Sequence, residues 1–170
     1  PKFSHILGAA FMFIKHSLLA LVTFFALQNA VQAADTPIPE PFVEILNNRA
    51  KDCDRIEFGN LTVKDEAIQA VDLNGDGALD HVLNEHHLNC DTARSLYCGT
   101  GGCQISFLIG DTMDTRLAKG WKLVEFSPMS VVLLPIHGSE CGGDNTTPCV
   151  QALVWDADKN AFSSIAPDPQ

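Results

Sequence analysis

The segment VDLNGDGALD, residues 71–80, gathers oxygen donors around two glycines. Counted from Asp72 as position one, side-chain oxygens fall at positions one, three, five and nine, and position seven can offer its backbone carbonyl. The candidate ligands are Asp72, Asn74, Asp76, Ala78 and Asp80. Donors at alternating positions converge when the chain curls around one point, and calcium accepts six to eight oxygens at about 2.3–2.6 Å. The spacing therefore predicts a Ca2+ loop.

Two further positions refine this prediction. Gly77, at position six, permits the sharp turn that an ion-wrapping loop needs. A helix–loop–helix calcium site carries a bidentate glutamate at position twelve, but Leu83 stands there and Glu85 comes two residues later. We therefore expect weak affinity, near the roughly 10⁻⁴–10⁻³ M of extracellular modules. The alternative is a tight turn of Asx motifs without an ion.

The same stretch resembles the calcium loops of FG-GAP and VCBS repeats, which read D-x-[DN]-x-D-G-x-x-D and lead directly into an apolar strand. Here Asp80 is followed by His81, Val82 and Leu83. The resemblance implies calcium binding at this one loop. It implies nothing about the remaining fold, because those families carry the loop in tandem in propellers and this chain has one copy.

All six cysteines follow residue 52, and an even count in an exported chain predicts three disulfides. Six cysteines allow fifteen pairings, among which the sequence alone does not choose. Cys141–Cys149 is the pair that the spacing favours most, because two glycines and a proline in CGGDNTTPC ease closure of the loop. For the others we expect Cys98–Cys103 with Cys53–Cys90. A cysteine metal site is disfavoured, because no CxxC pair occurs.

Two other segments carry reactive residue types. YCGTGGC, residues 97–103, lacks the GK[ST] ending of a phosphate-binding loop, so its glycines are expected to let the two sulfurs meet. NEHHLNC, residues 84–90, offers Glu85, His86 and His87 as zinc ligands. However, HExxH is absent and adjacent histidines on a strand face opposite ways, so we expect a solvated polar strand end.

The N-terminal third has the layout of a secretory signal peptide. Lys15 precedes an apolar run, residues 18–27, and Val31 and Ala33 are small residues at the expected positions before a cleavage site. The run is too short for a bilayer span of roughly 20 residues. We therefore expect a signal peptide at 1–33, in which 1–11 is an upstream extension, and one secreted or periplasmic domain at 34–170. An uncleaved membrane anchor is the alternative.

The charge of the chain limits its partners. It has 11 basic and 21 acidic residues, a net charge of −10. Removing residues 1–33 removes Lys2 and Lys15 and no acidic residue, which leaves −12. Such a field disfavours nucleic acid and anionic lipid surfaces and favours basic partners. The segments DLNGDG and CGTGGC, behind a predicted signal peptide, together resemble small exported bacterial proteins of unassigned function. This likeness implies a periplasmic or secreted location and no activity.

The elements that must hold these loops are mostly strands. Phe42 to Asp52 places apolar residues at spacings of three and four, as in an amphipathic helix. Short runs rich in Val, Ile, Leu and aromatic residues follow, and they lack intervening helices. The runs are 67–71, 80–83, 104–110, 121–127, 130–138 and 150–157. We expect an α+β fold with the N-terminal amphipathic helix packed on a mainly antiparallel β-sheet, stapled by disulfides. Pro135 places its strand at an edge or a bulge.

Two functions are compatible with this sequence. The first is an acidic binding or inhibitory module of the cell envelope, with a structural calcium loop and with residues 141–149 presented to a basic envelope or secreted protein such as a lysozyme. The second is a secreted hydrolase whose site is assembled from distant residues. His137, Ser139 and Glu140 could belong to such a site, but no GxSxG motif supports them. We favour the binding module and expect no nucleic-acid binding and no membrane insertion after signal cleavage.

Overall fold

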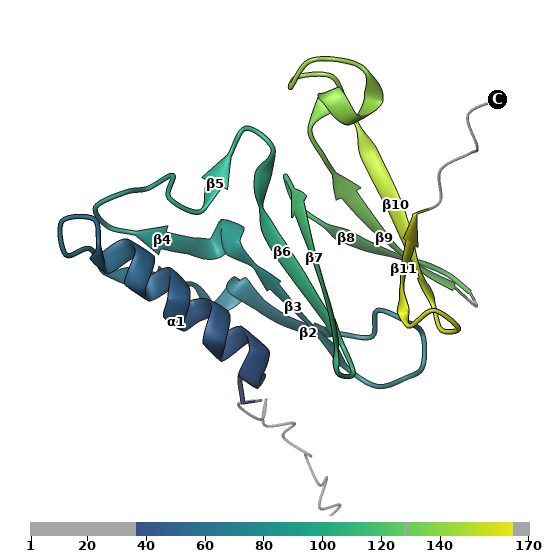
Figure 1. Cartoon of the computed structure of the whole chain (residues 1–170). Coiled ribbons are helices and arrows are strands. Elements are labelled where there is room, and N and C mark those ends of the chain that lie inside the picture. The colour runs from purple at the N-terminus through teal and green to yellow at the C-terminus, as the bar shows by residue number, and fades with distance from the viewer. Residues whose placement is uncertain (1–36, 128, 165–170) are drawn as a thin grey trace, which may run out of the picture. The chain divides into compact units, whose positions relative to one another are not determined.

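The computed structural model describes residues 37–127 and 129–164 (Figure 1). These residues belong to one unit, Pro37–Gln170, which is described by itself. The predicted signal peptide at 1–33, including the extension at 1–11, lies outside the described residues. Within the described part of the chain, no helix combines the length and the hydropathy that crossing a membrane requires.

The helix α1 spans Glu40–Asp54, slightly longer than the periodicity of the sequence predicted. Pro39 occupies the N-cap and Pro41 lies in the first turn. Proline is tolerated there because the N–H groups of the first turn have no hydrogen-bond partner within the helix. Glu40 in the first turn and Lys51 in the last suit the helix dipole.

The first sheet has the strand order β2-β3-β6-β5, and β7 pairs with β6. Its strands are β2 (Ile68–Val71), β3 (Asp80–Asn84), β5 (Cys98–Gly99), β6 (Gly102–Ile109) and β7 (Thr112–Ala118). A separate pair joins β1 (Leu61–Val63) to β4 (Leu88–Cys90). The predicted Ca2+ loop, which runs from Asp72 to Asp80 and which we call the aspartate loop, connects β2 to β3, and the short 3-10 helix η2 (Glu85–His87) connects β3 to β4. This sheet therefore positions both the aspartate loop and the histidine pair.

The second sheet has the strand order β11-β10-β9-β8. Its strands are β8 (Lys122–Phe126), β9 (Met129–Pro135), β10 (Val150–Asp156) and β11 (Ala161–Ser164). The expected hairpin around Asp156–Asn160 is confirmed as β10–β11. The edge placement expected from Pro135 is wrong, because β9 lies between β8 and β10. Pro135 is tolerated because it is the last residue of β9, beyond the β8 pairing that ends at Leu133.

Two clusters of buried side chains form the core. The first draws on both sheets and includes Phe107 from β6, Val132 from β9 and Leu153 from β10. The second contains Phe42 and Cys53 of α1 together with residues of the first sheet and of β4. Every pairing among the described strands is antiparallel. The prediction of mainly antiparallel sheets with one helix and disulfides is thus confirmed.

Candidate functional site

The aspartate loop is held by its own side chains. Asp72 accepts hydrogen bonds from the N–H groups of Gly75, at 2.7 Å, and Gly77, at 2.9 Å. Asn74 Oδ1 accepts from Asp76 N at 2.9 Å, and Asp76 Oδ1 accepts from Ala78 N at 2.7 Å. These are the bonds of successive Asx turns, so the sequence shapes the loop whether or not an ion is bound.

Asp80 fixes the loop to the core. Its Oδ2 accepts from Leu73 N at 2.9 Å, and both residues are buried. Burial raises the pKa of the Asp80 carboxyl, and the charges of Asp76 and Asp72 raise it further, against the lowering effect of the backbone N–H groups. Repulsion among these carboxylates is a cost that a bound cation would relieve.

The donor chemistry of this loop fits calcium, because each carboxylate oxygen that accepts one N–H keeps a second lone pair. The carboxylate oxygens of the loop lie farther apart than the ligand atoms of a closed metal shell. Among the described residues, sets of three His, Cys, Asp or Glu ligand atoms within 4.8 Å of one another occur at two other places, and the loop aspartates do not form one. Both of those sets include disulfide-bonded sulfurs, which lack the thiolate that binds a metal.

The six cysteines form three disulfides, the number that the sequence predicted. The bonds are Cys53–Cys90, Cys98–Cys103 and Cys141–Cys149. Disulfides of this number indicate an oxidising location outside the cytoplasm. The first ties the C-terminal end of α1 to β4, the second lies across the β5–β6 hairpin, and the third closes the connection between β9 and β10.

Glu85 lies in a different environment from the one expected. The prediction of a solvated strand end is wrong for this residue, which is 1% exposed. Arg49 of α1 explains its burial: Nε donates to both carboxylate oxygens at 3.0 Å, and Nη2 donates to Oε1 at 2.9 Å. Burial raises the pKa of Glu85, and the bonds and charge of Arg49 offset only part of that rise. The pair connects α1 to η2.

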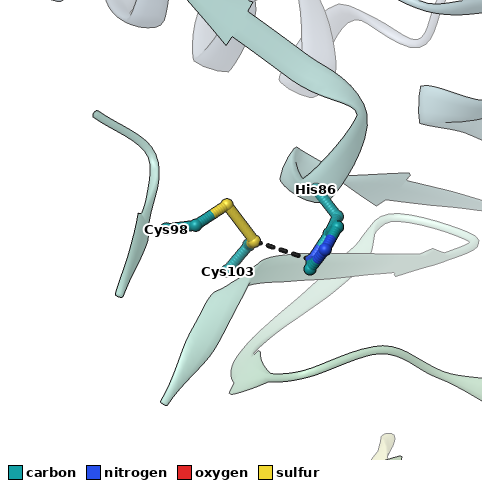
Figure 2. A group of neighbouring side chains, drawn as sticks. All are labelled: His86, Cys98 and Cys103. Atoms are coloured by element: carbon teal, nitrogen blue, oxygen red, sulfur yellow. Dashed lines mark hydrogen bonds between the residues drawn. A yellow bond between two sulfur atoms is a disulfide. The ribbon is translucent and has the colours of Figure 1, made fainter. Parts of the chain in front are cut away.

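His86 has a specific partner. Its Nδ1 lies 2.9 Å from the Sγ of Cys103, as Figure 2 shows. The imidazole is exposed, Cys98 is partly exposed and Cys103 is buried. His86 and His87 are on the helix η2 and not on a strand, so the expectation of opposite strand faces does not apply to them. Both line a hollow of about 420 Å³, together with Trp121 and Lys122.

The connection between β9 and β10 forms an exposed, internally bonded loop, residues 137–149, which we call the β9–β10 loop. Asp144 Oδ1 accepts from the backbone N–H groups of Thr146, at 2.9 Å, and Thr147, at 3.0 Å, and from both hydroxyls. Gly138 passes so close to this turn that a Cβ there would lie 1.8 Å from the carbonyl oxygen of Asp144. Lys119 Nζ donates to the carbonyl oxygen of Asn145 at 2.7 Å.

His137, Ser139 and Glu140 lie together at the start of the β9–β10 loop. His137 Nδ1 is 2.8 Å from Ser139 Oγ and accepts from Ser139 N at 3.2 Å. These contacts form a helix cap on η3 (Gly138–Cys141). A catalytic serine and its general base would be arranged in the same way, but here these hydrogen bonds also cap η3.

Comparisons with known proteins give no family: no family model, no curated protein and no solved structure matches the chain.

The structure brings some predicted residues together and separates others. The loop donors Asp72, Asn74, Asp76, Ala78 and Asp80 remain in one turn. The contact of His86 with Cys103 and the pairing of Glu85 with Arg49 were not predicted. The cysteines of CGTGGC and the adjacent histidines can be read from the sequence. Only the pairing of β3 with β6, however, brings His86 next to Cys103.

Proposed function

We propose that the protein is an exported acidic binding or inhibitory module that presents the β9–β10 loop to a basic protein of the cell envelope or its surroundings. The observation that carries this proposal is the loop itself, which is exposed, closed by Cys141–Cys149 and fixed by the hydrogen bonds of Asp144. A segment already ordered before binding loses little conformational entropy when a partner is bound.

The charge of the loop supports a basic partner. Residues 137–149 contain Glu140 and Asp144 and neither lysine nor arginine. Hydrogen bonds from Thr146 and then Thr147 lower the pKa of Asp144, so this exposed carboxylate is charged at neutral pH. Acidic surfaces speed the association of basic partners and select against acidic ones.

A pocket beside the β9–β10 loop is large enough for a side chain of the partner. Its volume is about 250 Å³, and its lining includes His137, Glu140, Leu117 and Ile136. Leu117 is 59% exposed. An apolar wall beside a carboxylate suits the aliphatic stem and charged end of a lysine or arginine.

In this proposal the aspartate loop is a structural Ca2+ site. Asp72, Asn74, Asp76, Asp80 and the carbonyl of Ala78 would hold the ion. Burial is the main reason that the pKa of Asp80 is raised, and the charge of the ion would offset the further rise that Asp76 and Asp72 cause. The ion would stabilise the β2–β3 connection and would take no part in partner recognition.

The proposal places the mature protein, from about residue 34, in the periplasm or in the secreted fraction. It also includes an amphipathic helix packed on the antiparallel sheet. The Cys53–Cys90 disulfide and the Arg49–Glu85 pair support that packing. A secreted hydrolase remains the competing function, and the observation that bears on it is the contact of His137 with Ser139, which also caps η3.

Affinity capture tests the proposal. The mature protein is immobilised, exposed to the envelope and secreted fractions of the producing organism, and eluted by raising the salt concentration, which screens charge pairs. We expect a basic protein to be enriched and released by salt. Retention of no basic protein above a blank support would contradict the proposal.

A further inference from the structure

We propose that the Cys98–Cys103 disulfide is a thiol–disulfide exchange site that accepts electrons from a dithiol, and that His86 stabilises the sulfur that leaves. This goes beyond partner binding, because it assigns a reaction to a different part of the molecule. The imidazole of His86 lies against the sulfur of Cys103, as Figure 2 shows.

The two sulfurs of this bond differ in access. Cys98 is partly exposed on the short strand β5, whereas Cys103 is 0% exposed at the start of β6. An external thiolate must approach a disulfide sulfur directly, so access decides which sulfur is attacked. The geometry therefore makes Cys98 the sulfur that is attacked and Cys103 the leaving group.

His86 is placed at the leaving group. A disulfide sulfur carries no hydrogen, so in the contact with Cys103 only the imidazole Nδ1–H can donate. Negative charge develops on Cys103 as the disulfide breaks, and a neighbouring imidazole or imidazolium stabilises such a thiolate. A leaving thiol of lower pKa leaves faster. His86 is exposed, so it can recover its proton from solvent.

The reaction proceeds in two displacements. One thiolate of the dithiol attacks Cys98 Sγ, a new S–S bond forms, the Cys98–Cys103 bond breaks, and its electron pair passes to Cys103, which takes a proton from the protonated imidazole of His86 and leaves that ring neutral. The second thiol of the reductant then gives up its proton and attacks the reductant sulfur that is bound to Cys98. That S–S bond breaks, and Cys98 leaves with its electron pair and takes up a proton. The dithiol is oxidised to a disulfide, and Cys98 and Cys103 are reduced, with two electrons and two protons transferred.

The other two disulfides serve as comparisons. Both sulfurs of Cys53–Cys90 belong to residues that are 0% exposed, so attack on either is hindered. Cys141 is exposed, more so than Cys98, and among the described contacts neither sulfur of its bond has an imidazole neighbour. If access alone set the rate, Cys141–Cys149 would be reduced first.

The experiment measures the reduction rates of the three disulfides in the folded protein. The oxidised protein is mixed with dithiothreitol in native buffer, quenched with an alkylating reagent at successive times, and mapped by mass spectrometry. The readout is the rate of Cys98–Cys103 divided by that of Cys141–Cys149 in the same sample, which removes differences in reductant concentration between samples.

We expect this ratio to exceed one in the native protein. In His86→Gln it should fall about tenfold, because the glutamine amide can neither protonate the leaving sulfur of Cys103 nor stabilise it with a positive charge. His87→Gln is the matched control, because it alters the adjacent imidazole and should leave the ratio unchanged. A native ratio of one or less, or an equal ratio in His86→Gln and the native protein, would overturn the proposal.

Discussion

Arg49 of α1 and Glu85 of η2, which are 36 residues apart, form a two-pronged ion pair whose carboxylate is buried and whose guanidinium is partly exposed. The side-chain exposures are 25% for Arg49 and 2% for Glu85. Loss of the arginine would leave a charge inside the protein, whereas loss of the glutamate would leave a guanidinium that reaches solvent. The two partners therefore contribute unequally to stability.

This asymmetry predicts the order of two substitutions. Arg49→Ala should lower the free energy of unfolding by about 3–5 kcal/mol, because Glu85 becomes an unpaired buried charge. Glu85→Gln should cost less than about 1 kcal/mol at neutral pH, because the neutral amide avoids the burial cost that raises the pKa of Glu85 and its oxygen can still accept one of the bonds from Arg49. Urea denaturation at neutral pH measures both. Equal losses would contradict this account of the pair.

The pH dependence of stability should carry the same signature. Burial raises the pKa of Glu85 in the folded state above its ordinary value of 4.5, so the folded protein binds this proton more tightly than the unfolded chain does. Stability from this group is present below 4.5 and is lost as the pH rises through the raised pKa. The unfolding free energy of the native protein minus that of Glu85→Gln should therefore fall across this window. A difference that grows with pH would show a lowered pKa instead.

Calcium should stabilise the protein through the aspartate loop. At about 100 times the dissociation constant, binding adds roughly 2.7 kcal/mol, enough to raise the melting temperature by several degrees. Magnesium should do much less, because its octahedral demand suits a flexible loop poorly. Asp76→Ala should abolish the response to calcium, and Asp158→Ala, an exposed aspartate in the β10–β11 turn, should retain it. Equal melting temperatures in chelator, calcium and magnesium would leave only the Asx-turn interpretation.

The disulfides should differ in their contribution to stability. Cys53–Cys90 closes a separation of 37 residues and Cys141–Cys149 one of 8. By chain entropy the longer bond contributes about 4 kcal/mol and the shorter about 2–3 kcal/mol. Replacing both cysteines of a pair by alanine should thus destabilise the protein more at 53 and 90, where the sulfurs are also buried. Thermal melts of the two double variants give the order, and a larger loss at 141 and 149 would contradict it.

What the sequence predicted well was local. The Phe42 periodicity indicated α1, and the glycines and proline between Cys141 and Cys149 indicated that pair, because each depends on residues close in the chain. The strand β7 was missed. Its segment TMDTRLA has only Met113, Leu117 and Ala118 as apolar residues, and it includes Asp114 and Arg116, which pair at 2.6 Å, so it is not the run of Val, Ile, Leu and aromatic residues by which the other strands were predicted.

What the sequence could not predict depends on distant residues. From the sequence Glu85 was expected to be solvated, but in the fold Arg49 pairs with it and it is buried. His86 was expected to be a polar surface residue, but the pairing of β3 with β6 brings it to Cys103. Pro135 suggested an edge strand, yet β9 accommodates it at its last residue because the pairing with β8 has already ended. In each case tertiary pairing, rather than local propensity, sets the environment of the side chain.

If the β9–β10 loop binds a basic protein, reversing a charge on that loop should weaken the complex. The captured protein is titrated calorimetrically against the native protein, Glu140→Arg and Asp158→Arg. Both variants change an exposed carboxylate and shift the net charge equally, but Asp158 lies in the turn at the far end of β10. We predict that Glu140→Arg weakens binding about tenfold or more, about 1.4 kcal/mol, and that Asp158→Arg stays within about twofold of the native affinity. Equal affinities for the two variants would contradict the claim.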